Sequence, residues 1–275
     1  MACGLAGALS VDGLRLRTHA WPRPGRPRAL LLHSVAGHGH WWDWAAPLLA
    51  ERFDVLALDL RGHGDSEHAP GGAYAFDDHL GDLVGVLGAL GGAPPVVIGH
   101  SMGGYLAALL ASRRPELVAA VVITDILTAW PPALSEIARR QAERASPEFP
   151  DAATAAARFR FSPPEEGAPP ERVRHLGEAG VIERRPGAWT TAFDRRVFLH
   201  PPADPWPFLP RIACPALVLH GEHSEVMSAE ACRRAAAAIP RGRAATLPGV
   251  HHHLIVEDPE RFARVVLDWH ASPDA

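Results

Sequence analysis

A serine flanked by glycines stands between an apolar run and a run of small residues. Residues 99–104 read GHSMGG; they follow the sequence VVI and precede YLAALLA. The apolar run predicts a buried strand and the small residues predict a helix that crosses it closely. In that setting a G-x-S-x-G motif places the serine on a tight, strained turn with its hydroxyl exposed. Ser101 is therefore the candidate nucleophile, and the first amide of the following helix is a candidate donor to a developing oxyanion.

Further along the chain, short apolar runs alternate with segments of helical spacing. Buried strands are expected at residues 28–33, 54–58, 95–98, 117–124, 216–220 and 243–247, and an alternating, half-buried strand at 10–20. Helices are expected at residues 44–51, 76–90, 103–113, 229–239 and 259–270. Strands and helices in this order predict an α/β fold with a mostly parallel central sheet and helices on both faces.

Residues 126–210 break the alternation. They hold many prolines, and only the stretches 134–144, 152–160 and 171–179 have helical character. Such a segment is too long for a loop and too broken for strands of a sheet. We therefore expect a helical cap or lid at 126–210, inserted into a core formed by residues 1–125 and 211–275.

Several motifs, taken in order, resemble those of the α/β-hydrolase superfamily. Residues 33–37 (HSVAG) are similar to its HG-x-x-G oxyanion loop, with Ser34 where glycine is usual. Residues 59–66 (DLRGHGDS) are similar to its D-x-R-G-x-G-x-S turn, and residues 249–254 (GVHHHL) to its late G-x-G-H-x-L. The resemblance runs from about residue 8 to residue 270, with the cap matched by position alone. It implies the α/β-hydrolase fold and says little about the substrate.

The resemblance also implies roles for individual residues. His252 aligns with the family's base, which takes the proton of Ser101 and returns it to the leaving group. The backbone amides of Val35 and Met102 align with the oxyanion donors. A run of three histidines can also indicate a metal tract, but residues 251–253 lie inside the chain at the place of the base.

At the position where the family has the carboxylate that orients its histidine base, the sequence departs from the family pattern. After the strand LVLH, where the family has G-x-x-D, the chain reads GEHS and so places Ser224 at the acid position. Glu225 is one residue later, and its longer side chain makes it the expected partner of His252. Asp125, just past the strand at 117–124, is the alternative, because both carboxylates follow strands at the same sheet edge.

Aromatic side chains gather around the predicted mouth of the site. His33, Trp41 and Trp42 lie in or after the oxyanion loop, and Trp130 and Trp189 lie in the cap. They are candidates for lining an apolar substrate pocket, although tryptophan is equally expected in a core or an interface. The loop histidines lack the ligand spacing of metallohydrolases, so no metal is expected.

The composition limits the kinds of molecule that the protein is expected to bind. The formal net charge is −4, which gives no general attraction to nucleic acid or to an anionic membrane. All 27 basic residues are arginine, and the absence of lysine excludes a Walker-type phosphate loop and a lysine Schiff base. No dinucleotide-binding motif follows the first buried strand. We therefore expect no cofactor. Residues 83–112 carry no charge but are divided by glycine and proline, which argues against a membrane span.

The cysteine pattern and the start of the sequence bear on the compartment. The chain has three cysteines, Cys3, Cys214 and Cys232, which form no CxxC pair. No basic segment precedes the mild apolar stretch at the start of the sequence. A reducing, cytoplasmic environment is expected.

These residues predict a cofactor-free serine hydrolase that cleaves a small ester, thioester or lactone with an apolar part through an acyl-enzyme. A serine at position 101, rather than an aspartate, argues against the dehalogenases and epoxide hydrolases of the family. Two alternatives stay open. The same residues could carry out carbon–carbon bond hydrolysis, elimination or cofactor-free oxygenation, or the fold could serve as a non-catalytic ligand receptor. The sequence does not indicate the oligomeric state.

Overall fold

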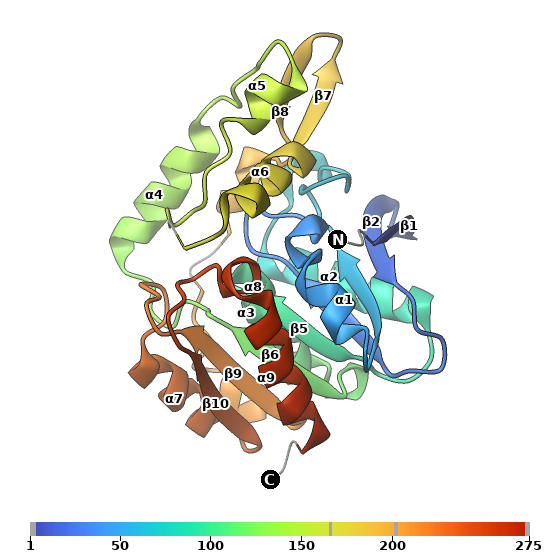
Figure 1. Ribbon diagram of the computed structural model, residues 1–275, viewed down its shortest axis with the longest axis vertical. Helices are drawn as coiled ribbons and strands as arrows, with labels where there is room; N and C mark the ends of the chain where they lie inside the picture. The colour runs from blue at the N-terminus through green and yellow to red at the C-terminus, as the bar shows by residue number, and fades with distance from the viewer. Residues whose placement is uncertain (1–3, 165–166, 201–202, 273–275) are drawn as a thin grey trace.

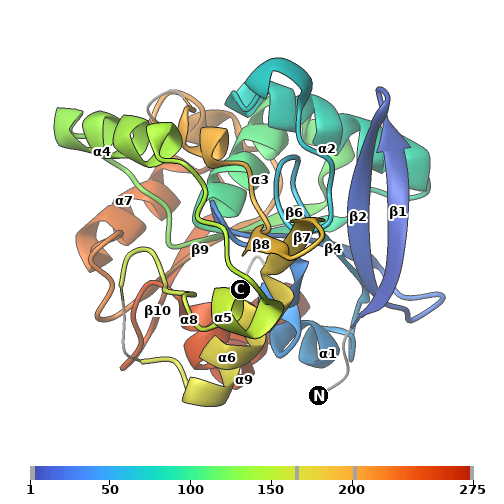
Figure 2. The same cartoon turned by 90° about the horizontal axis from the view of Figure 1, so that it is seen from above.

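An eight-stranded sheet with helices on both faces dominates the computed structural model, which describes residues 4–164, 167–200 and 203–272 (Figures 1 and 2). The strands lie in the order β1-β2-β4-β3-β5-β6-β9-β10. Their bounds are Leu5–Val11 (β1), Leu14–Trp21 (β2), Arg28–Leu32 (β3), Asp54–Leu58 (β4), Val96–His100 (β5), Ala120–Thr124 (β6), Ala216–Gly221 (β9) and Gly242–Leu247 (β10). β1, β2 and β4 pair antiparallel, and every pairing from β4 to β10 is parallel. The predicted fold class is confirmed.

The parallel strands feed two apolar cores, because successive side chains of a strand point to opposite faces. In β3, Leu30 and Leu32 belong to one core, and Ala29 and Leu31 belong to the other. The first core is covered by α2 (Phe76–Leu90), α3 (Met102–Arg113) and α7 (Ala229–Ala238); the second is covered by α1 (Ala45–Leu49), α8 (Leu254–Glu257) and α9 (Pro259–Ala271). Burial on both faces explains why these strands are nearly continuous apolar runs in the sequence.

The single strand expected at residues 10–20 is a hairpin of β1 and β2. Asp12 and Gly13 form its turn, both with positive φ. A two-residue Asp-Gly turn of this kind matches the twist of the flanking strands, so the sequence did contain the signal for a hairpin. The short 3₁₀ helices are Gly39–Trp42 (η1), Pro70–Gly72 (η2), Pro115–Leu117 (η3), Arg195–Phe198 (η4) and Leu209–Arg211 (η5).

The described part of 126–210 contributes no strand to the main sheet. It forms α4 (Pro132–Glu143), α5 (Ala152–Ala156), α6 (Pro170–Ala179) and a separate two-stranded sheet of β7 (Val181–Arg185) and β8 (Ala188–Thr191). In Figure 1 these elements lie beyond one end of the sheet strands. The β7–β8 hairpin was not predicted; its turn uses Gly187, whose φ is 73°.

A buried carboxylate joins this segment to the core. Asp43 is fully buried, and its Oδ2 accepts hydrogen bonds from His40 Nδ1 at 2.9 Å and from His175 Nε2 of α6 at 2.8 Å. Burial alone would raise the pKa of the Asp43 carboxyl, but the hydrogen bonds from His175 and His40 hold that pKa at about 2. His38 Nε2 adds a second link by donating to the Leu176 carbonyl at 3.2 Å.

Three expectations about redox state and membranes can be compared with the structure. Among the described residues, no helix is long and apolar enough to cross a membrane. The uncharged stretch at 83–112 is divided among α2, β5 and α3. Cys214 and Cys232 are free thiols, and Cys3 lies outside the described residues.

Acid should weaken the contact between Asp43 and His175. Because the folded pKa of Asp43 lies near 2, below the ordinary 3.8, its stabilising contribution is present above about pH 4 and is lost as the pH falls toward 2. That shift corresponds to about 2 kcal/mol. We predict that His175→Ala lowers the free energy of unfolding in urea clearly at about pH 5, and roughly half as much at about pH 3. An equal loss at both pH values would contradict the assignment.

Candidate active site

Ser101 occupies a strained turn between β5 and α3. Its φ of 54° and ψ of −119° lie outside the regions that non-glycine residues usually adopt. The Ser101 amide donates to the Thr124 carbonyl of β6 at 2.8 Å, and the residue keeps partial exposure. A Cβ added to Gly99 would lie 2.1 Å from the Gly103 carbonyl oxygen, so only glycine allows the helix to approach the strand this closely. The backbone has the strand–turn–helix form that the motif predicts.

His252 and Asp125 form a buried pair at the same sheet edge. His252 Nδ1 lies 2.9 Å from Asp125 Oδ1, and the side chains are 2% and 0% exposed. Asp125 directly follows β6, and His252 lies between β10 and α8. With Nδ1 turned to the carboxylate, Nε2 is on the opposite side of the ring, which is the nitrogen that a base in a serine triad uses.

Three donors converge on the Asp125 carboxylate. Oδ1 accepts from His252 and, at 2.7 Å, from Ser224 Oγ, while Oδ2 accepts from the Gly221 amide at 2.9 Å. Both oxygens of a fully buried carboxylate are therefore satisfied. The orientation of Asp125 is fixed by β9 and by the loop that follows it.

The expectation that Glu225 contacts His252 is wrong for this structure. Glu225 is exposed, and Asp125 makes the hydrogen bond to the imidazole instead. The reason is strand order: β6 and β9 are neighbouring parallel strands, so Asp125 and Ser224 arrive at the same edge from adjacent strand ends. Ser224, at the position where the family has its acid, donates to the Asp125 carboxylate at the end of the neighbouring strand.

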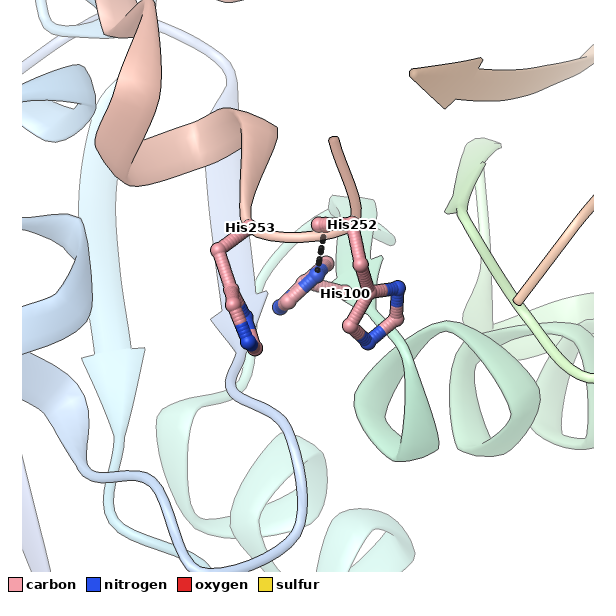
Figure 3. A group of neighbouring side chains, drawn as sticks. All are labelled: His100, His252 and His253. Carbon is pink, nitrogen blue, oxygen red and sulfur yellow. Dashed lines mark hydrogen bonds between the residues drawn. The ribbon is translucent and has the colours of Figure 1, made fainter. Parts of the chain in front are cut away.

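Two further histidines, His100 and His253, lie beside His252 (Figure 3). His100, at the end of β5, donates from Nε2 to the His252 carbonyl at 2.8 Å, and the two rings lie 4.7 Å apart. His253 Nε2 donates to the Pro163 carbonyl at 3.1 Å. Burial, and next the neighbouring His252, lower the pKa of His253 to about 3 and that of His100 well below its usual range. Both rings therefore stay neutral and act as hydrogen-bond donors to backbone.

Two groups of described side chains bring possible metal-ligand atoms within 4.8 Å of one another. They are His100, His252, His253 and His40, Asp43, His175. One ring nitrogen of each histidine makes a hydrogen bond given above, to a carboxylate or to a backbone carbonyl. These bonds explain why the side chains lie close together, and we assign neither group to a metal.

The two expected oxyanion donors come from segments that pack closely. Met102 is the first residue of α3, so its amide is among the helix's N-terminal N–H groups that have no intrahelical acceptor. A Cβ on Gly103 would lie 2.2 Å from the Leu32 carbonyl oxygen, so the start of α3 lies against the strand end that leads to Val35. The role of the Val35 and Met102 amides stays a prediction.

His33 and Trp42 do not line a substrate pocket, contrary to expectation. His33 is fully buried; Nδ1 donates to the Ser34 carbonyl at 2.7 Å, and Nε2 accepts from the Leu60 amide at 3.0 Å. Burial lowers the pKa of His33 to about 3, which keeps Nε2 available as that acceptor. Trp42 is fully buried and packs against Phe262 of α9. His33 ties two loops together, and Trp42 belongs to the core.

Trp41 lies between the core and residues 126–210. It is 3% exposed, and its ring contacts those of His100, His253, Phe159 and Phe161. The apolar surface beside the histidines is therefore built from both parts of the chain.

The other two tryptophans have different surroundings. Trp130 Nε1 donates to Ser135 Oγ at 2.8 Å, and its ring lies beside His200. Trp189 lies in β8, where its backbone pairs with Phe149. The roles of Trp130 and Trp189 in a pocket stay predictions.

Comparison with known proteins gives a family match over most of the chain. The family model described as alpha/beta hydrolase fold matches residues 27–259. A putative carbamate hydrolase, RutD, from Caulobacter segnis is 36% identical over 117 residues, which is 42% of this chain and 44% of the relative. The matched region thus spans less than half the length of that relative.

Two other similarities cover nearly the whole chain. A 2-(acetamidomethylene)succinate hydrolase from Mesorhizobium japonicum is 24% identical over 263 residues, 94% of this chain and 93% of the relative. The thioesterase domain from the curacin biosynthetic pathway has a TM-score of 0.81 at 24% identity, over 97% of this chain and 100% of that domain. At this low identity, the similarity to the thioesterase domain is evidence for the fold alone.

Proposed function

The chain belongs to the alpha/beta hydrolase fold family, and from this premise we propose that it is a serine hydrolase that needs no cofactor and cleaves a small ester, thioester or lactone. The observation that carries the proposal is the buried hydrogen bond from His252 to Asp125 at the sheet edge where Ser101 occupies its strained turn. The relatives are named for hydrolysis of different acyl compounds, which supports acyl transfer as the common chemistry.

In the proposed reaction, Ser101 Oγ attacks the carbonyl carbon of the substrate while its proton passes to His252 Nε2. Asp125 holds the imidazole in the required tautomer and stabilises the imidazolium. The carbonyl electron pair moves onto oxygen, where the amides of Val35 and Met102 would hold the negative charge. Collapse of this intermediate expels the alcohol or thiol, which takes the proton from His252. Water then repeats the sequence on the acyl-enzyme and releases the acid.

We further propose that residues 126–210 act as a lid on a core of residues 1–125 and 211–275. The Asp43–His175 bond, the His253–Pro163 bond and the packing of Trp41 on Phe159 and Phe161 support a closed arrangement. These aromatic rings beside His100 and His253 favour a substrate with an apolar part. The free thiols of Cys214 and Cys232 support a reducing, cytoplasmic setting.

Removing the nucleophile should abolish hydrolysis. We predict that Ser101→Ala lowers kcat/KM by about 10³-fold or more on the best substrate of a panel of p-nitrophenyl esters and lactones of graded chain length. The thermal midpoint should change little, since the side chain is small and partly exposed. Undiminished turnover would favour a mechanism without acylation of Ser101, and a wild type that binds but turns over nothing would favour a receptor.

The two carboxylates should differ sharply in their effect on rate. Asp125→Asn keeps size but leaves His252 with a neutral partner and the wrong tautomer, so kcat should fall by about 10³- to 10⁴-fold. Glu225→Gln, the matched control on an exposed side chain, should keep near wild-type turnover. Steady-state kinetics of both variants on one ester decides the assignment, and a crippled Glu225→Gln beside an active Asp125→Asn would reverse it.

A further inference from the structure

Arginines from three separate segments meet around a pocket of about 320 Å³. The pocket lies beyond the C-terminal end of α4, beside β7 and η4, and the loop after β4 contributes one histidine to its wall. The charged and titratable residues that line it are Arg144, Arg184, Arg195, Arg196, Asp194 and His68. None of these residues has a part in the proposed catalytic reaction.

The carboxylate in this pocket is already engaged. Asp194 Oδ2 accepts from Arg196 Nη2 at 2.5 Å and from the Tyr74 hydroxyl at 2.8 Å. The hydrogen bonds from Arg196 and Tyr74 hold the pKa of Asp194 at about 2 even though burial opposes this. Asp194 Oδ2 therefore already has Arg196 and the Tyr74 hydroxyl as partners, and His68 Nδ1 lies 3.5 Å from the same oxygen.

In the described residues, none of the remaining three guanidinium groups is paired with a carboxylate. Arg195 Nε donates to the Gln141 carbonyl at 3.1 Å, and Arg184 Nη2 lies 3.2 Å from His68 Nε2. Within the part of the chain that the structure describes, Arg144 makes no hydrogen bond or ion pair. Three positive charges thus share one pocket without a carboxylate of their own.

The arginines of the pocket affect the titration of neighbouring groups. Burial, and next the charge of Arg184, lower the pKa of His68, and the charge of Asp194 opposes this shift. Burial, and next the charge of Arg144, lower the pKa of Arg195. The Arg195 guanidinium also lies over the Phe193 ring, with its Cζ 6.0 Å from the ring centroid.

We propose that this pocket binds a compact oxyanion, a phosphate or carboxylate group, through Arg144, Arg184 and Arg195. A guanidinium presents two parallel N–H donors that match the paired oxygens of such groups, and several guanidinium groups around one pocket favour a small, highly charged anion. Because the walls come from α4, β7, η4 and the core loop at His68, the bound anion would also link segments of the cap to the core. The proposal does not depend on the catalytic assignment.

Isothermal titration of the full chain with sodium phosphate, and separately with sodium succinate, tests this site. At constant ionic strength set by sodium chloride, we expect saturable one-site binding of at least one of the two anions. Arg184→Gln and Arg195→Gln should each weaken that binding by about 10-fold or more, the effect of one charge-assisted hydrogen bond. Circular dichroism checks that each variant is folded.

A matched control comes from the same part of the cap. Arg139 of α4 is paired with Glu136 and Glu143, so Arg139→Gln should bind the anion as the wild type does. Ser101→Ala should also bind normally, which separates this site from the proposed reaction. Phosphate binding alone identifies a phosphate group as the ligand, and succinate binding alone identifies a carboxylate. No saturable heat with either anion, or an equal loss in Arg139→Gln, would overturn the proposal.

Discussion

A carboxylate removed from water must find hydrogen-bond donors for both oxygens, and the edge of the sheet around Asp125 is built to supply them. Ser224 and Gly221 bring donors from the end of β9, and His252 brings one from the segment after β10. The Ser101 amide bonds to the carbonyl of Thr124, the residue before Asp125. The pairing of β5, β6, β9 and β10 therefore sets the segments that carry the candidate nucleophile, acid and base with respect to one another before any substrate binds.

A second buried carboxylate, with both of its donors on Oδ2, lies at the junction between residues 126–210 and the rest of the chain. Asp43 is buried there, and its donors come from His40 of the core and His175 of α6. Trp41 packs against His100 and His253 of the candidate site and against Phe159 and Phe161, and Phe161 also stacks on His253. The Asp43–His175 hydrogen bond and the packing of Trp41 on the two phenylalanines both join residues 126–210 to the core. The surface next to the candidate site therefore depends on how these residues pack against the core.

Sequence reasoning succeeded where the signal was local. The G-x-S-x-G motif between an apolar strand and a small-residue helix predicted the Ser101 turn, and apolar runs predicted the parallel strands. For the partner of His252, the sequence favoured Glu225 and gave Asp125 as the alternative, because the reach of a side chain depends on which strands are neighbours. The hydrogen bond from Ser224 to Asp125 follows from the β6–β9 pairing, which the sequence does not show. His33 and Trp42 were misplaced because proximity to a motif does not indicate burial. The Asp43–His175 contact joins residues too far apart in sequence for any pattern to reveal.

The central claim is that Asp125, through His252, makes Ser101 a nucleophile. The most direct measurement is the rate at which a fluorophosphonate labels the protein, with the modified residue located by peptide mass spectrometry. The account predicts one label for each chain, on Ser101, formed rapidly in the wild type and at least about 100-fold more slowly in Asp125→Asn, since the base then has the wrong tautomer. Labelling at another residue, or equal rates in the two proteins, would contradict it.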